Sequence, residues 1–156
     1  MYESDTKGGV VDAIYLDFAK AFDTVPHRRL TGKLEAYGKS GVILNWVNAF
    51  LSGRTQKVVV NRSNSEKAPV LNGIPQGMVI GPILFVVYIN DILEGISYNG
   101  VMFADDTKIF CQIVSYDDSM ALQADISKLE TWSNIWQLGF NVDKCHVLTL
   151  GRFENT

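Results

Sequence analysis

Residues 10–18 read Val-Val-Asp-Ala-Ile-Tyr-Leu-Asp-Phe, a run of β-branched, aliphatic and aromatic residues that closes on a carboxylate and a ring. Such a composition is typical of a mostly buried β-strand. Asp17 lies near the carboxyl end of this strand. The stretch therefore predicts a core strand with an acidic side chain at its end.

Two apolar patterns with helical spacing follow this strand, and each ends at a glycine, Gly38 or Gly53. Glycine at the end of such a pattern is a common helix stop. The second pattern is an aromatic-rich stripe, which we expect in the core. The elements predicted up to residue 93 are helices over 30–37 and 43–51, a half-exposed strand over 55–61, a polar turn over 61–67, a short strand over 68–71 and a buried helix over 82–93.

The last third of the chain begins with a predicted hairpin of strands 101–104 and 107–113, whose turn holds Asp105 and Asp106. A long helix capped by residues 117–119 then runs to Gly139, and a strand over 147–150 follows. Strands and helices alternate without βαβ regularity. We therefore expect an α+β fold, in which helices pack on one face of an antiparallel sheet.

The composition is that of a globular protein of ordinary domain size. The chain has 156 residues, of which 47% are hydrophobic and 20% charged, so we expect a single unit with a substantial core. The longest apolar run, Ile83–Ile89, is far too short to cross a membrane, and residues 1–9 carry no secretory signal. Cys111 and Cys145 have no partners at metal-ligand spacing. Reduced thiols and no signal predict an intracellular protein, in nucleus or cytoplasm, that is not secreted.

The charges are distributed unevenly along the chain. The formal net charge is −3, yet residues 20–67 hold nine basic and three acidic side chains, a local charge of +6. The remainder holds five basic and fourteen acidic side chains, a charge of −9. One part of the chain is thus suited to phosphates and another to cations, although solvated faces would have the same pattern.

Three carboxylates are the strongest candidates for chemistry: Asp17 at a strand end, and Asp105 and Asp106 at a hairpin tip. Both positions can present side chains to one point at a sheet edge. Two Mg²⁺ ions would suit such a group, because paired metals stabilise the attacking and leaving oxygens in phosphoryl transfer. The equally paired Asp117 and Asp118 are interpreted instead as a helix cap.

The sequence around these carboxylates closely resembles the palm motifs of reverse transcriptases of LINE-type, jockey-like non-LTR retrotransposons. The resemblance runs through nearly the whole chain in the family's order. The whole chain, residues 1–156, is therefore interpreted as a partial reverse transcriptase domain, the palm with part of the fingers. The matching segments are YLDFAKAFD at 15–23, GIPQG at 73–77, GPILF at 81–85, IND at 89–91, FADD at 103–106 and FNVDKC at 140–145.

The resemblance implies an RNA-directed DNA polymerase that transfers dNTPs to a primer 3′-hydroxyl on an RNA template. Asp17 and Asp105 match the family's metal-binding aspartates, and Asp106 is their neighbour in the catalytic turn. The carbonyl of Phe18 would complete the shell of the second metal. The implied cofactor is two Mg²⁺ ions, with Mn²⁺ as a substitute, and the implied partners are an RNA template, a DNA primer and dNTP, but no membrane.

The resemblance also implies a nucleotide site and a backbone-binding surface. Phe22 matches the aromatic residue that excludes a 2′-hydroxyl, and Gln76 and Gly77 match the loop at the nascent base pair. Lys144 matches a lysine that neutralises or protonates the leaving pyrophosphate. The basic residues assigned to the template or primer backbone are Arg28, Arg29, Arg54, Lys57 and Arg62.

The sequence departs from the family pattern at Met78, where a small residue is usual, and at His146, where lysine is common. The basic finger strands expected before Asp17 and a thumb after residue 141 are largely missing from the 156 residues. We therefore expect weak or no activity from this chain alone, with finger and thumb segments supplied by a parent polyprotein. Three alternatives stay open: a non-catalytic retroelement remnant that folds and at most binds nucleic acid, a two-metal nuclease, and a structural protein.

Overall fold

The computed structural model describes residues 9–151, which divide into two compact units where composition indicates one. The sheet unit lies within residues 9–19, 91–135 and 139–151. The helical unit comprises residues 20–90 and 136–138. The chain first passes from the sheet unit to the helical unit between residues 19 and 20, shortly after the predicted core strand.

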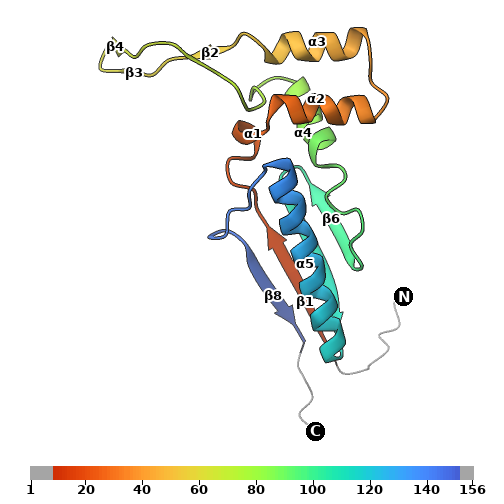
Figure 1. The fold of residues 1–156 in the computed structure, drawn as a ribbon. Helices are drawn as coiled ribbons and strands as arrows, with labels where there is room; N and C mark the ends of the chain where they lie inside the picture. The colour runs from red at the N-terminus through yellow and green to blue at the C-terminus, as the bar shows by residue number, and fades with distance from the viewer. Residues whose placement is uncertain (1–8, 152–156) are drawn as a thin grey trace. The chain divides into compact units, whose positions relative to one another are not determined.

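The sheet unit is a four-stranded antiparallel sheet with one long helix. Its strands follow the order β6-β7-β1-β8, so the first strand of the chain lies inside the sheet (Figure 1). The bounds are β1 (Val10–Leu16), β6 (Asn99–Phe103), β7 (Asp106–Ile113), α5 (Tyr116–Trp136) and β8 (His146–Leu150). This arrangement confirms the predicted fold class, an antiparallel sheet covered by a helix on one face.

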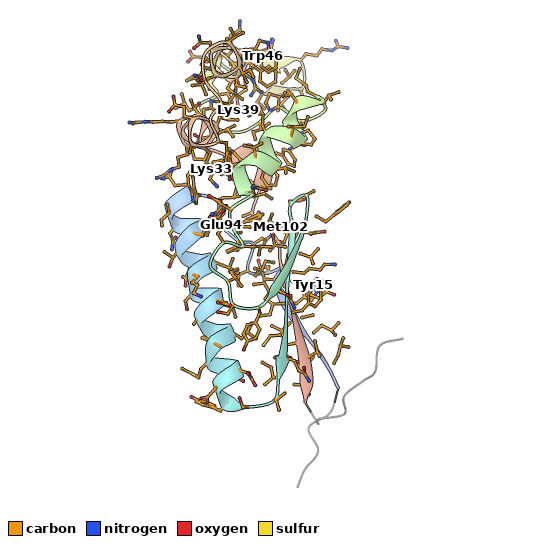
Figure 2. All side chains as sticks on the ribbon, turned by 90° about the vertical axis from the view of Figure 1, so that its right-hand side faces the viewer. Tyr15, Lys33, Lys39, Trp46, Glu94 and Met102 are labelled. Carbon is orange, nitrogen blue, oxygen red and sulfur yellow. The ribbon has the colours of Figure 1, made fainter. Side chains whose placement is uncertain are left out.

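Alternation along the strands divides the sheet into a buried and an open face. Ile14 on β1 pairs with Ile109 on β7, and both are buried with Leu122 and Leu129 of α5. Tyr15 points the other way, and Figure 2 shows it on the side of the sheet away from α5. Period-two alternation requires that Asp17 and Tyr15 share the open face.

Several predicted bounds in this unit need correction, among them those of β6, which spans Asn99–Phe103 and not 101–104, and the end of α5, which lies at Trp136. β1 ends at Leu16, and Phe18 forms an isolated bridge with Phe140, because the neighbouring chain there is the loop before β8. β8 begins one residue earlier than predicted, at His146. The hairpin turn is Ala104-Asp105, since Asp106 already pairs with Phe103 as the first residue of β7.

The start of α5 confirms the predicted cap for Asp118, whose partner is Ser115 and not a residue within 117–119. The carboxylate of Asp118 accepts bonds from the Ser115 and Val114 backbone N–H groups, at 2.8 and 3.0 Å, and from the Ser115 hydroxyl at 2.9 Å. The Ser115 Oγ in turn accepts a bond from the Asp118 N–H. This reciprocal pattern is a capping box, which satisfies N–H groups that the helix cannot.

Asp118→Ala should lower the melting temperature at pH 7, and the difference from the wild type should become smaller in acid. Bonds from the Val114 N–H and from Ser115 hold the pKa of the Asp118 carboxyl below its ordinary value of 3.8. A depressed pKa in the folded state adds stability above the unfolded pKa, and this is lost as the pH falls through the folded one. Thermal melts at pH 7 and pH 3 check this. A variant that melts with the wild type at both values would contradict it, and the exposed Asp117→Ala should have the smaller effect at pH 7.

The helical unit holds four helices and an extended hairpin. The helices are α1 (Ala21–Thr24), α2 (His27–Ala36), α3 (Val42–Leu51) and α4 (Ile80–Ile89). The hairpin consists of two short ladders, β2 (Thr55–Gln56) with β5 (Ala68–Pro69) and β3 (Val59–Val60) with β4 (Ser63–Asn64). α2 packs on α3 and on α4. Buried side chains of this unit include Leu30, Leu34, Val47, Leu51, Leu84 and Phe85.

Several predictions for this unit were wrong in detail. The expected strand 55–61 is broken into two-residue pieces around a turn at Asn61 and Arg62, and its side chains are almost all exposed, so no core face holds it straight. The stripe on α3 is only partly core, because Ile43 and Trp46 remain 55% and 51% exposed. α1 was not predicted, and α4 spans 80–89 with Ile83 on its exposed side.

A buried lysine joins α2 to α4. Lys33 is 3% exposed, and its ammonium donates to the carbonyl oxygen of Tyr88, one of the last residues of α4. The same ammonium lies 3.9 Å from the ring centroid of Trp136 and 5.1 Å from that of Tyr88. Two aromatic faces and a helix-end carbonyl thus hold the charge, which explains how a lysine is tolerated there.

No helix within residues 9–151 is long and apolar enough to span a membrane. The cysteines Cys111 and Cys145 are both free thiols.

Candidate active site

Two of the predicted carboxylates line one pocket on the sheet unit. Asp17 directly follows β1, and Asp106 opens β7, so both stand at the same end of the paired strands. With Lys144 they line a pocket of about 400 Å³. Asp105 occupies the hairpin turn next to Ala104, whose φ of 55° places it in the left-handed region. Among residues 9–151, no three His, Cys, Asp or Glu side chains gather closely enough to hold a metal ion.

The side chain of Asp17 has an oxygen that protein groups leave unsatisfied. Its Oδ1 is buried and accepts no hydrogen bond. The Nζ atom of Lys144 lies 3.6 Å away, close enough for an ion pair but too far for a hydrogen bond. A buried carboxylate oxygen with free lone pairs is costly and is well suited to a cation ligand. Asp17 therefore fits a divalent metal.

Backbone contacts fix the position of Asp17. Its carbonyl oxygen accepts a bond of 2.8 Å from the N–H of Asn141, and the N–H of Ala19 donates to Gly139 at 2.8 Å. Between them, the ring of Phe18 is buried and stacks on Phe140, with centroids 5.0 Å apart. The loop before β8 thus clamps the end of β1. This clamp brings Lys144 to Asp17, although the two are distant in sequence.

A second row of side chains crosses the open face of the sheet at Tyr15, two residues before Asp17 in the chain. Tyr15 pairs with Lys108 on β7 and with His146 on β8. The Lys108 Nζ lies 4.7 Å from the Tyr15 ring centroid, and the His146 ring stacks on the other side at 4.6 Å. All three line the same pocket as Asp17. None of the three was predicted as a site residue, and His146 was noted only as a departure from the family pattern. Period-two spacing from Asp17 and Asp106 nevertheless places Tyr15 and Lys108 on this face.

The helical unit contains a separate polar pocket of about 740 Å³. Its charged and amide-bearing lining residues are Lys20, Asp23, Arg54, Gln56, Asn72 and Gln76. The Gln76 side-chain amide donates to the Asp23 carboxylate at 3.3 Å. Gln76 and Arg54 were predicted as binding residues, whereas Lys20 and Asp23, which flank Phe22 in the chain, were not. Two cations beside an amide and a carboxylate can bind an anionic, hydrogen-bonding ligand.

Of the other residues assigned to the nucleotide, Phe22 and Gly77 lie next to this pocket in the chain, whereas Lys144 belongs to the sheet unit and lines the pocket of Asp17. Phe22 is half-buried and stacks on Phe85 of α4, with ring centroids 4.6 Å apart. Gly77 has a φ of 79°, a left-handed conformation that favours glycine. Phe85 supports the Phe22 ring and was not identified from sequence. The sequence placed it in the predicted buried helix 82–93, which gave only a core signal.

The basic residues assigned to a nucleic-acid backbone fall into separate groups. Arg28 and Arg29 line a pocket of about 490 Å³ with Pro26 and Gln137, and the Arg29 Nε donates to the Gln137 side chain at 3.3 Å. Lys57 and Arg62 are exposed on the extended hairpin, Arg62 within its tip. Arg54 belongs instead to the polar pocket with Gln76.

Comparison with known proteins gives a consistent result. The family model for reverse transcriptase (RNA-dependent DNA polymerase) matches residues 4–153. The chain is 30% identical over 144 residues to the RNA-directed DNA polymerase from mobile element jockey of Drosophila melanogaster, which covers 86% of this chain and 16% of that protein. It is also 30% identical over 142 residues to the Pol polyprotein of the type-2 retrotransposable element R2DM of Drosophila melanogaster, covering 83% of this chain and 13% of that protein.

Among solved structures, the fold is similar to that of telomerase. Apo telomerase from Candida tropicalis, truncated from its C-terminal domain, matches with a TM-score of 0.65 and 12% identity, over 98% of this chain and 33% of that one. Telomerase from Candida albicans, in complex with a fragment of telomeric RNA, matches with a TM-score of 0.62 and 14% identity, over 94% and 27%. At these identities the likeness concerns the fold alone.

Proposed function

This chain belongs to the reverse transcriptase (RNA-dependent DNA polymerase) family, in its non-LTR retrotransposon branch, and we propose that it carries the palm chemistry of RNA-directed DNA synthesis. The reaction is transfer of a deoxynucleotide from dNTP to a primer 3′-hydroxyl opposite an RNA template. The observation that carries the proposal is the buried, unsatisfied Oδ1 of Asp17 within the matched motif. The chain spans 16% of the jockey protein, so the activity of the longer protein is part of the proposal.

Asp17, Asp105, Asp106 and the carbonyl oxygen of Phe18 are the proposed ligands of two Mg²⁺ ions, for which Mn²⁺ can substitute. When bound, such a pair lowers the pKa of a primer hydroxyl and neutralises charge that develops on the pyrophosphate. Asp17 is held for this role by the Asn141 N–H, which fixes its backbone. Asp106 opens β7 and lines the pocket with Asp17, and Asp105 precedes it in the hairpin turn.

Lys144 has two proposed roles, which follow from its position 3.6 Å from Asp17. Its ammonium balances the Asp17 carboxylate, which would otherwise be an unpaired, partly buried charge. It also offers protons that can be donated to the leaving pyrophosphate or can neutralise it. Lys144→Ala should therefore affect the step that releases pyrophosphate more than the binding of template.

The polar pocket of the helical unit is the proposed dNTP-binding surface, with Gln76 and Gly77 on the loop and Phe22 as the residue that excludes a 2′-hydroxyl. The cations Lys20 and Arg54 are suited to a polyphosphate, and the Gln76 amide is suited to a base or sugar edge. Arg28, Arg29, Lys57 and Arg62 are proposed to contact the template or primer backbone. Such contacts make binding salt-dependent and largely independent of base sequence.

Discrimination between dTTP and 5-methyl-UTP, which differ only in the 2′-hydroxyl, tests the proposal on this chain without relying on turnover, which we expect to be weak. The wild-type chain, with an oligo(dT)-primed poly(rA) template and Mn²⁺, should bind dTTP about 10- to 200-fold more tightly than 5-methyl-UTP. Phe22→Ala should bring the two dissociation constants close together, because the wall against the 2′-hydroxyl is gone. Phe22→Tyr keeps the ring and should keep the preference. Equal affinities in the wild type, or no dTTP binding, would contradict the proposal.

A further inference from the structure

The N-terminal residue of α2 makes a side-chain contact across 46 positions of sequence. The Nε2 atom of His27 lies 2.7 Å from the carbonyl oxygen of Gly73. A carbonyl oxygen can only accept, so Nε2 carries the proton and donates it. The contact is partly buried, where a hydrogen bond is stronger than in water. His27 thus ties the segment that follows Phe22 to the loop that carries Gln76 and Gly77.

Backbone bonds join the same two segments. The Gly73 N–H donates to the carbonyl of Val25 at 2.8 Å, and the Ile74 N–H donates to the carbonyl of Phe22 at 2.7 Å. Pro26 and Asn72 form an isolated antiparallel bridge. Both polar groups of the Gly73 backbone are therefore taken, the N–H by the main chain and the carbonyl by the His27 ring.

Beyond Ile74, which is buried and bonded to Phe22, the hydrogen bonds that hold this segment become few. The Gln76 side chain meets Asp23 at 3.3 Å, an exposed bond near the outer limit for hydrogen bonding. Gln76 and Gly77 are themselves exposed. The orientation of the loop over the polar pocket consequently depends on how firmly Gly73 and Ile74 are held at its start.

We propose that His27 is a positioning residue that locks the Gly73 carbonyl and so holds the Gly73–Gly77 loop in a nucleotide-binding arrangement. The inference rests on the proposed function for its consequence, nucleotide affinity, but the lock itself is independent of it. An imidazole suits this task because its rigid ring has two rotatable bonds, so that little conformational entropy is lost when the bond forms. His27 touches the loop and not the pocket, whose lining does not include it.

His27→Leu and His27→Gln, made in the full 156-residue chain, form a matched pair. Leucine removes the donor, whereas the glutamine amide can place a nitrogen near the Nε2 position and donate to Gly73. Hydrogen exchange should show the amides of Gly73 and Ile74 exchanging about 10-fold faster in His27→Leu and near the wild-type rate in His27→Gln. The dissociation constant for dTTP should rise about 5- to 10-fold in His27→Leu only. Affinity for Mn²⁺ at Asp17, in the sheet unit, should not change.

The outcomes separate the lock from the nucleotide proposal. Wild-type exchange rates at Gly73 and Ile74 in His27→Leu would overturn the inference, whatever the nucleotide data show. Faster exchange with unchanged dTTP affinity would also overturn it, because the loop would then not need the lock to bind. If the wild-type chain itself binds no dTTP, the proposed function fails, and the exchange rates alone decide whether His27 holds the loop. Loss of Mn²⁺ binding in His27→Leu would indicate general unfolding, and failure of His27→Gln to restore exchange would then overturn the inference.

Discussion

Asp17→Asn is expected to abolish saturable Mn²⁺ binding to this chain while leaving its melting temperature unchanged or higher. The amide keeps the shape of the carboxylate but loses the negative charge that a divalent cation requires, so affinity should fall by more than about 100-fold. The folded chain loses little, because Oδ1 is buried without a hydrogen bond and its charge is costly there. Isothermal titration with Mn²⁺ and thermal melts measure the two effects together.

The chain supplies a matched control for this variant in Asp117→Asn. Asp117 carries the same carboxylate, but it is exposed in the first turn of α5 and does not line the pocket of Asp17. Its replacement should leave Mn²⁺ affinity as in the wild type and cost only the small stabilisation that an acidic side chain gives to a helix N-terminus, about 0.3–1 kcal/mol. Wild-type Mn²⁺ binding in Asp17→Asn, or equal loss in both variants, would place the metal elsewhere and favour a non-catalytic protein.

The combination of lost function and retained stability distinguishes a ligand from a structural residue. A carboxylate that stabilised the fold through Lys144 would reveal itself by a lower melting temperature when neutralised. At 3.6 Å, with the lysine 64% and the aspartate 25% exposed, that ion pair is too long and too solvated to contribute much. Asp17 therefore has the properties of a group kept for binding at some cost to folding.

The sheet unit could be predicted closely because its signals are local. The β-branched and aromatic run in residues 10–16, the paired hairpin strands and the acidic start of α5 are each contained in a few consecutive residues. The apolar stripe on α3 was wrongly predicted to lie in the core, because its burial depends on contacts that are not local. Helical spacing identifies a face, but it does not say what covers that face, and Ile43 and Trp46 stay half-exposed.

In the candidate site, too, the local features could be predicted and the long-range contacts could not. The family motifs identified Asp17, Gln76 and Lys144, but they did not identify the residues that contact these side chains and hold them in position. The contact between Lys144 and Asp17 and the bond from His27 to Gly73 join residues that are far apart in the chain, and single-sequence patterns do not report such pairs. The row of Tyr15, Lys108 and His146 was within reach, since alternation from Asp17 already places Tyr15 on the open face.

Gly73→Ala is expected to cause the largest loss of stability among the variants considered, about 3–5 kcal/mol. Gly73 has a φ of +92°, which an L side chain rarely adopts, and a Cβ atom built there would lie 2.8 Å from the Asp23 carbonyl oxygen. The obstacle is backbone, so it cannot rotate aside. Moving the loop would break the bonds from Gly73 to Val25 and from Ile74 to Phe22. Chemical denaturation monitored by circular dichroism should show the lower midpoint.

Gly32→Ala, in the same unit, is a control that should raise the free energy of unfolding instead of lowering it. Gly32 lies inside α2, and a Cβ atom there would have nothing within 4 Å, so the substitution should stabilise by about 0.5–1 kcal/mol through helix propensity. If Gly73→Ala unfolds like the wild type, the loop does not hold the left-handed conformation described. Mn²⁺ binding to Gly73→Ala shows whether the sheet unit is also affected, because Asp17 lies in the sheet unit. Retained Mn²⁺ affinity with a lower midpoint would confine the loss to the helical unit, which is the result expected if Gly73 acts through the loop contacts alone.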